Sequence, residues 1–200
     1  GNVLCRLWQS QWLLWGLFMT STYNLVIVTL ERYLAVVHPL YHRTHATLQR
    51  TKIIAILVWP FGLVYSLYQV TTAVVTDKKC DRLSDWPSEQ FNIDFGITTT
   101  FVEFLIPLLL MITCYTRMAI ALRTKVSPTS EEPARMVRAR RNVVKTLAVV
   151  CFFFCACWMS NQLFFLALNL GEPIDKIGSS FHKWSILAAD LNCCINPVIY

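Results

Sequence analysis

Charge is scarce in this chain. Only 15% of its 200 residues are charged and 55% are hydrophobic, whereas about a quarter of the residues of a soluble protein are charged. The stretch 53–75 carries no charged residue at all. Apolar blocks of about 20 residues are long enough to cross a bilayer as helices. The composition therefore excludes an ordinary soluble domain, and we expect an all-α integral membrane protein in a lipid bilayer.

Features that would indicate other classes of membrane protein are also missing. The chain has no internal repeat of the kind that marks the matching halves of transporters, and no loop that resembles a channel filter. Its four histidines fall at 38, 42, 45 and 182, in two separate parts of the chain, so they cannot build a metal or nucleophile site. We therefore do not expect a transporter, a channel or an enzyme.

Both ends of the sequence suggest a piece of a longer protein. The first residues lack the charged start and the cleavage pattern of a secretory signal peptide. The last five residues, Asn196 to Tyr200, close an apolar segment and no tail follows them. We expect a fragment of a larger membrane protein, cut at both ends.

The net charge of +6 follows a topological pattern and does not indicate nucleic-acid binding. Twelve of the 18 Lys and Arg residues lie in two clusters, 32–52 and 117–145, whereas the other six share the alternate loops with acidic residues. Membrane proteins keep an excess of Lys and Arg in their cytoplasmic loops. Both clusters are therefore predicted to face the cytoplasm.

Between these loops lie five apolar segments, each long enough to span a bilayer with some tilt. They are predicted to cross in alternating directions, and the first begins outside. We expect them to form one partial membrane domain over residues 1–200. The predicted spans are residues 8–37, 53–75, 91–122, 138–170 and 179–200.

Six of the eight cysteines lie inside the predicted spans, where cysteine usually behaves as a small hydrophobic residue. Cys5 and Cys80 differ, because both fall at outer ends of spans, in the oxidising compartment. We expect a disulfide between them that ties the first span to the outer loop. Metal binding is the alternative, but no His or second Cys lies nearby at ligand spacing.

Six short motifs follow one another along the chain. Glu31-Arg32-Tyr33 is uninformative alone, because an arginine that snorkels beside a glutamate is a common interface anchor. The others are His38-Pro39-Leu40, Trp59, Pro107 with Tyr115, the run Phe154 to Trp158, and Asn192 before Asn196-Pro197-Val198-Ile199-Tyr200. In this order and at these intervals they resemble the rhodopsin-like (class A) G-protein-coupled receptor family. The resemblance covers the whole chain, from that family's third transmembrane helix to the end of its seventh.

The resemblance implies a plasma-membrane receptor whose inner face activates a heterotrimeric G protein. Arg32 and Leu40 would contact the G protein, and Tyr115 and Tyr200 would swing inward to hold the open state. For each aromatic residue, plain core packing is the alternative. The implied activation residues are Glu31, Arg32, Tyr33, Pro39, Leu40, Tyr115, Phe154, Trp158, Asn196, Pro197 and Tyr200.

Two departures from the family pattern bear on its geometry. The family's Trp-x-Pro reads Trp158-Met159-Ser160 here, so the usual proline kink is absent. We expect Ser160 to bend the helix by bonding back to its own turn. Cys5 lies two residues farther from Arg32 than is usual in the family, which leaves the shape of the upper helix open.

The resemblance also places Ser21, Asn192 and Asn196 at positions that line a sodium-ion pocket, although the acidic residue of that pocket belongs to a helix absent from this chain. An allosteric sodium ion is thus a candidate. Retinal is excluded, because opsins carry the retinal-binding lysine six residues before the final Asn, and Asp190 stands there. No other cofactor is expected.

Acidic side chains within the spans predict a ligand with a cationic group, because ionisable residues in a membrane usually face a cavity or a partner. Protonation or hydrogen bonding inside the bundle is the alternative. Leu14 replaces the aspartate of amine receptors, which disfavours a standard amine ligand, although an amine receptor that uses Asp190 stays open. The predicted pocket consists of Leu14, Trp15, Phe18, Glu103, Gln162, Phe165 and Asp190.

The loops add an analogy to this interpretation. A charged outer loop with a short inner loop is more typical of neuropeptide receptors than of amine receptors, which is an argument from the fold family alone. We therefore expect a receptor for an extracellular peptide-like or other cationic ligand. The main alternative is a decoy or scavenger receptor of the same fold that does not signal.

Overall fold

The computed structural model describes residues 2–45, 47–76, 79–81, 85–125, 134–170 and 179–199. Tyr200 lies outside these ranges, and only the backbone of Asn192, Asn196 and Pro197 is described. In chain order, the elements are α1 (Asn2–Leu4), η1 (Cys5–Gln9), α2 (Trp12–Val37), α3 (Pro39–His45), α4 (Leu48–Tyr65), α5 (Tyr68–Thr71), β1 (Val74–Thr76), β2 (Lys79–Asp81), α6 (Glu89–Thr100), η2 (Phe101–Leu105), α7 (Ile106–Lys125), α8 (Ala134–Asn169) and α10 (Ser179–Ile199).

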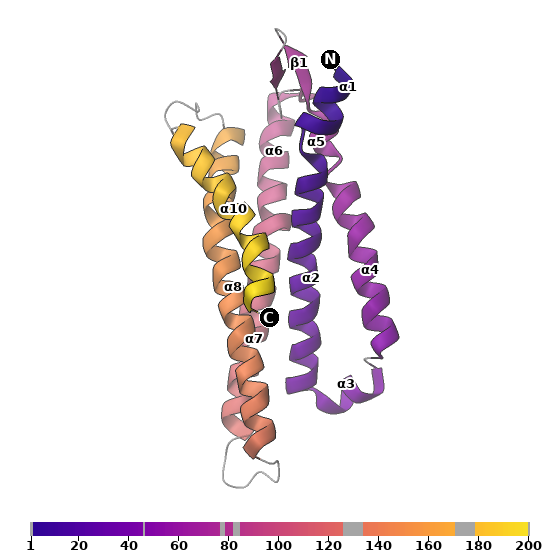
Figure 1. The fold of residues 1–200 in the computed structure, drawn as a ribbon, viewed down its shortest axis with the longest axis vertical. Helices are drawn as coiled ribbons and strands as arrows, with labels where there is room; N and C mark the ends of the chain where they lie inside the picture. The colour runs from indigo at the N-terminus through magenta and orange to yellow at the C-terminus, as the bar shows by residue number, and fades with distance from the viewer. Residues whose placement is uncertain are drawn as a thin grey trace.

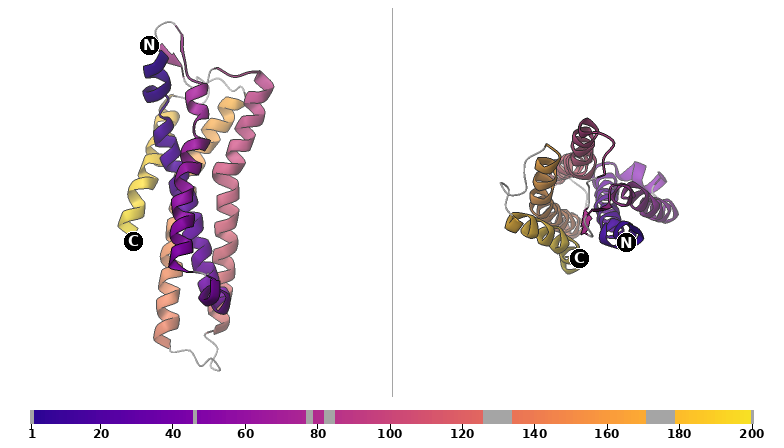
Figure 2. Two further views of the ribbon diagram at one scale, coloured as in Figure 1. Left: turned by 90° about the vertical axis from the view of Figure 1, so that its right-hand side faces the viewer. Right: turned by 90° about the horizontal axis from the view of Figure 1, so that it is seen from above.

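The long helices form an elongated bundle, which confirms the all-α fold class (Figure 1). Helix α2 lies inside this bundle, with α4 packed on one side and α7 on the other, while α8 packs against α7 and α10 (Figures 1 and 2). Within the described residues, four helical stretches are long and apolar enough to cross a membrane: Cys5–Val37, Gln49–Thr71, Glu89–Arg123 and Arg141–Asn169. Helix α10 is long enough at 21 residues, but Lys183, Asp190 and two asparagines make it less apolar.

The second span ends earlier than the sequence predicts. Helix α4 stops at Tyr65, after which come the short helix α5 and an antiparallel hairpin in which Val75 pairs with Cys80. The helical part of this span therefore ends at Thr71, and the last residues of the predicted span, Val74 and Val75, belong to β1. Apolar residues alone do not separate a buried helix from a short strand, and the β-branched Val74-Val75-Thr76 favours a strand.

The first span begins differently as well. The chain is already helical from Asn2, widens into the π-helix η1, and breaks at Gln11, whose φ of 59° is left-handed. Gln11 is the N-cap residue of α2 and makes no side-chain cap hydrogen bond, whereas the preceding Ser10 accepts a long hydrogen bond from the backbone N–H of Trp12 at 3.4 Å. The predicted start at Trp8 thus falls within η1.

The third span is one continuous helical stretch from Glu89 to Lys125 with a π-helical turn in its middle. Pro107 follows this turn, and a proline has no N–H to donate to the preceding turn. Just before the proline, the backbone N–H of Ile106 bonds to the carbonyl of Phe101, five residues back, which is the hydrogen bond of a π-helix. Single π-turns of this kind are frequent at functional sites, and this one contains Glu103.

Candidate functional site

An aromatic cluster joins α2 to α8 in the upper half of the bundle. Trp15 and Phe18 of α2 lie edge to face at 5.7 Å between ring centroids, and Phe18 meets Trp158 of α8 in the same manner at 5.8 Å. Trp158 continues to Phe154 at 6.2 Å along α8. Edge-to-face pairs at these separations are favourable beyond the area they bury. The structure therefore brings together two predicted pocket residues, Trp15 and Phe18, and two implied activation residues, Phe154 and Trp158.

Glu103 connects the π-turn to α8 beside this cluster. The Gln162 side-chain nitrogen Nε2 donates a hydrogen bond to Glu103 Oε2 at 3.0 Å. Gln162 is only 3% exposed, and in the described part of the chain its carbonyl oxygen Oε1 has no partner. Trp158 Nε1 is also buried without an acceptor there. One acceptor and one donor, a helical turn apart on α8, are thus available next to a carboxylate.

The other predicted pocket residues are more loosely placed. Leu14 is half-buried and packs on the cluster that contains Phe18 and Trp158. Phe165 and Asp190 are also half-buried, Phe165 on α8 and Asp190 on α10, where its neighbour Ala189 is packed into the same core. Asp190 is therefore linked to the cluster only through its sequence neighbour Ala189, whereas Glu103 is bonded to Gln162 beside the cluster.

At the opposite end of α2, the Glu31-Arg32-Tyr33 motif is open to its surroundings. Arg32 is exposed and Glu31 is half-buried, while Tyr33 Oη lies 3.4 Å from His38 Nε2. Pro39 begins the short helix α3, on which Leu40 is 79% exposed. A large apolar side chain that stays exposed is available to a partner. The structure presents these residues on one end of the bundle (Figure 1).

Tyr115 of α7 bonds to α2 near this end, through a residue that the sequence did not single out. The hydroxyl oxygens of Thr29 and Tyr115 lie 2.9 Å apart. Thr29 Oγ1 also donates to the Leu25 carbonyl at 2.8 Å. A hydroxyl has a single hydrogen to donate, so Tyr115 is the donor in the bond to Thr29. Nothing in the sequence marks Thr29, because a threonine that bonds its own helix is common in membrane spans.

The sodium-pocket prediction concerns three residues of which only one has a described side chain. Ser21 lies half-buried on α2, whereas the side chains of Asn192 and Asn196 fall outside the described residues. A sodium ion at this position stays a prediction.

Ser160 makes the predicted bond back to its own turn, because its hydroxyl donates to the carbonyl of Cys157, three residues earlier, at 3.3 Å, while the bend expected from this bond stays a prediction. Helix α8 nevertheless runs as one α-helix of 36 residues. Residue 160 is not a proline, so the sharp kink that a proline causes in a helix is not expected at this position.

At the outer end, the disulfide between Cys5 and Cys80 is present, which confirms this prediction (Cα–Cα 5.5 Å). Arg6 adds two further ties to the same loop, since its Nε donates to the Ala73 carbonyl at 3.1 Å and its NH2 group lies 3.9 Å from Asp85 Oδ2. The π-helix and the break at Gln11 lie directly between Cys5 and α2. The sequence has two more residues than is usual in the family between Cys5 and Arg32, and both irregular features lie in this stretch.

Comparison with known proteins agrees with this geometry. Residues 1–200 match the family described as 7 transmembrane receptor (rhodopsin family). Similar curated proteins include galanin receptor 2b of Danio rerio (29% identical, covering 90% of this chain and 48% of the relative) and the substance-P receptor of Aquarana catesbeiana (29%, 90% and 46%). Somatostatin receptor type 5 of Bos taurus is 31% identical over 100% of this chain and 54% of its own length.

The fold and the site thus define a helical membrane receptor, and the match over the whole chain is decisive. The chain belongs to the rhodopsin family of seven-transmembrane receptors. It is a multi-pass plasma-membrane protein and not an enzyme. The chain spans about half the length of the curated relatives it matches.

Proposed function

We propose that this receptor binds a basic peptide-like ligand on its outer side and activates a heterotrimeric G protein on its inner side. Family membership and relatives named as galanin, substance-P and somatostatin receptors support this proposal. The observation that carries the choice of a basic ligand is the Glu103–Gln162 pair, because it combines a carboxylate with a buried carbonyl oxygen that has no partner in the described residues.

A cationic N–H group fits this pair better than any other chemistry. A buried acceptor without a hydrogen bond costs about 1–3 kcal/mol, so a donor that reaches Gln162 Oε1 recovers this energy. A guanidinium or ammonium group also compensates the charge of Glu103, and charge-assisted bonds are about twice as strong as neutral ones. Trp158 lies one helical turn before Gln162 on α8, and aromatic rings attract cations through their faces.

Replacing Glu103 with glutamine tests the basic-ligand proposal. Glu103→Gln keeps the shape of the side chain and removes its charge, so we expect the potency of a basic peptide agonist to fall about 10- to 100-fold. The measurement is agonist-dependent guanine-nucleotide exchange by the full-length receptor, after a screen of basic peptides and amines. Glu89→Gln, an exposed glutamate in the first turn of α6, is the matched control. Unchanged potency in both Glu103→Gln and Asp190→Asn would exclude a cation site.

The same experiment separates the two alternatives. An amine receptor that uses Asp190 is expected to lose potency in Asp190→Asn and to retain it in Glu103→Gln. A decoy or scavenger receptor is expected to bind the ligand without any nucleotide exchange.

The proposed switch at the inner end makes a separate prediction about Tyr115. Thr29→Val removes the acceptor that holds the Tyr115 hydroxyl, and a single hydrogen bond contributes about 0.5–1.5 kcal/mol. We therefore expect agonist-independent nucleotide exchange to rise roughly two- to tenfold, measured at equal surface expression. Thr113→Val is the control, because Thr113 lies on α7 and, in the described part of the chain, its hydroxyl donates to the Leu109 carbonyl of its own helix. Equal basal exchange in both variants would show that the Thr29–Tyr115 bond does not restrain the switch.

A further inference from the structure

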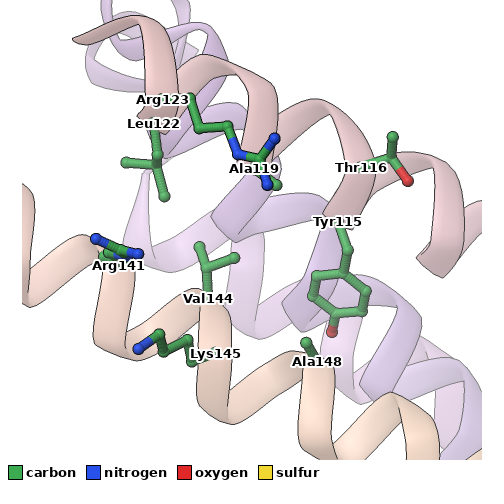
Figure 3. Close-up of a pocket in the computed structure, with 9 residues that line it drawn as sticks. All are labelled: Tyr115, Thr116, Ala119, Leu122, Arg123, Arg141, Val144, Lys145 and Ala148. Atoms are coloured by element: carbon green, nitrogen blue, oxygen red, sulfur yellow. The ribbon is translucent and has the colours of Figure 1, made fainter. Parts of the chain in front are cut away.

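Two tyrosine hydroxyls join α2 to the third span. Tyr115 of α7, which also lines a cavity of about 580 Å³ between the inner ends of α7 and α8 (Figure 3), bonds to Thr29 near the inner end. The other is Tyr23, whose hydroxyl donates to the backbone carbonyl of Val102 at 3.0 Å. Val102 belongs to the π-turn and directly precedes Glu103. A hydroxyl of α2 is thus bonded to the backbone of another helix beside the proposed ligand contact.

The Val102 carbonyl needs this donor because its own helix does not supply one. In an α-helix the carbonyl would accept from the backbone N–H four residues on, that of Ile106, but in the π-turn this N–H bonds to Phe101. The donor five residues on would be residue 107, and Pro107 has no N–H. Within a membrane no water replaces a missing donor, so an unsatisfied carbonyl is costly there. The hydroxyl of Tyr23 therefore satisfies the carbonyl that the π-turn frees.

Tyr23 is itself held in place by α4. Its ring meets that of Phe61 edge to face, with 5.3 Å between the centroids, and Phe61 stacks on Tyr65 of the same helix at 6.2 Å. Tyr23 is half-buried, so its ring contact and its hydroxyl bond both restrict the side chain. The hydroxyl therefore reaches the π-turn from a defined position on α2.

The bond to the π-turn bears on where Glu103 lies. If the turn returned to α-helical geometry, the Ile106 N–H would satisfy Val102, and the hydroxyl of Tyr23 would no longer be needed. The helix before the turn would then rotate relative to the helix after it by about 100°, the angle of one residue. Glu103 lies within the turn, so this rotation would carry its carboxylate away from Gln162, whose Nε2 it contacts at 3.0 Å. The hydroxyl of Tyr23 therefore favours the geometry in which the carboxylate meets its partner.

We propose that Tyr23 is a positioning residue that holds the π-turn so that Glu103 faces Gln162 and the cationic group of the ligand. This inference rests on the proposed role of Glu103 in ligand binding, and Tyr23 acts through the turn and not by contact with the ligand. The alternative is that Tyr23 only fills space between α2, α4 and the turn. In that case the ring would suffice, and the hydroxyl would make no difference.

Thermal unfolding of the purified full-length receptor without ligand tests the bond to the turn. Tyr23→Phe keeps the ring and removes the donor, and we expect it to lower the Tm by a few degrees. Pro107→Ala supplies a backbone N–H for the freed carbonyl, so in this background Tyr23→Phe is expected to lower the Tm much less. Tyr41→Phe, at an exposed tyrosine of α3, is the control and is expected to leave the Tm unchanged. An equal loss in both backgrounds, or no loss in either, would overturn the proposal.

The position of residue 103 is measured separately with methanethiosulfonate ethylammonium, a small cation that modifies thiols, applied to the outer side of membranes that contain the receptor. The thiol introduced by Glu103→Cys is expected to react faster than the wild-type background. Adding Tyr23→Phe is expected to slow this reaction several-fold, whereas adding Tyr41→Phe leaves its rate unchanged. A general loosening of the bundle would raise the rate instead.

The two measurements separate this proposal from the proposed function. A reaction rate that Tyr23→Phe leaves unchanged or raises would overturn the positioning role, even if Glu103→Gln lowers agonist potency. If the thiol introduced by Glu103→Cys did not react with Tyr23 present, a cation could not reach this point, and the proposed basic site would fail. The unfolding measurements would then still decide whether Tyr23 holds the π-turn.

Discussion

Gly62→Leu is expected to remove most of the receptor from the cell surface. A Cβ atom at Gly62 would press on Thr20 Oγ1 and would lie 2.7 Å from the Gly16 carbonyl oxygen and 2.9 Å from the Thr20 backbone nitrogen. Two of these three are backbone atoms of α2, which cannot rotate away. Small residues let membrane helices approach closely, and this is the point where α4 approaches α2. Surface expression and the Tm of the purified receptor are the measurements.

Two further variants define the cause of this effect. Gly62→Ala adds a single methyl group and is expected to cost about 1–3 kcal/mol, as overpacking usually does. Val64→Ile adds one methylene on the same helix at a side chain that is 65% exposed, and it is expected to leave expression and Tm unchanged. If Gly62→Leu reached the surface with wild-type Tm, the close approach of α2 and α4 would not support the fold.

Features determined by charge and composition could be predicted from the sequence. The apolar runs predict the helices, and the bias of Lys and Arg toward two loops predicts which loops face the cytoplasm. The pairing of Cys5 with Cys80 was predictable for a similar reason, because these are the two cysteines that fall outside the spans. Neither inference needs any knowledge of side-chain packing.

Helix ends and local irregularities could not be predicted in the same way. Residues 66–75 continue the apolar run of α4, and only tertiary contacts decide that Val74-Val75-Thr76 pairs as a strand. Gln11 carries a left-handed backbone although nothing in its side chain requires it. The π-turn at Phe101–Leu105 depends on packing against the neighbouring helices as well as on Pro107, and this packing cannot be read from the sequence.

In the candidate site, some features could be predicted from the sequence and others could not. The sequence predicted Trp15 and Phe18 in the ligand pocket, and the family resemblance implied an activation role for Trp158; the rings of these three residues do meet. The bond between Glu103 and Gln162 depends on the π-turn, because one extra residue in a turn changes the face on which Glu103 lies. Sequence could therefore identify both residues as unusual within a membrane, but not that they bond to each other.

Loss of the Cys5–Cys80 disulfide is expected to weaken ligand binding more than loss of any other contact at the outer end. The bond closes a loop of 75 residues, for which the chain-entropy model gives roughly 4 kcal/mol. The Arg6–Asp85 pair has half-exposed partners, and such surface pairs contribute only about 0–1 kcal/mol. Without the disulfide, Arg6 still joins η1 to this loop through the hydrogen bond from its Nε to the Ala73 carbonyl and through its weak pair with Asp85, but we expect the outer rim to lose its defined shape.

A double-mutant cycle measures this coupling. Cys5→Ser, Cys80→Ser and the double variant are expected to lower agonist affinity equally, by tenfold or more, because each removes the same bond. Cys157→Ala, a half-buried cysteine without a disulfide, and Arg6→Ala serve as comparisons with small expected effects. Additive losses in the double variant would contradict the prediction, because they would show that the two cysteines act separately. The equal loss therefore isolates the covalent tie from the packing of either cysteine, which no single variant can do.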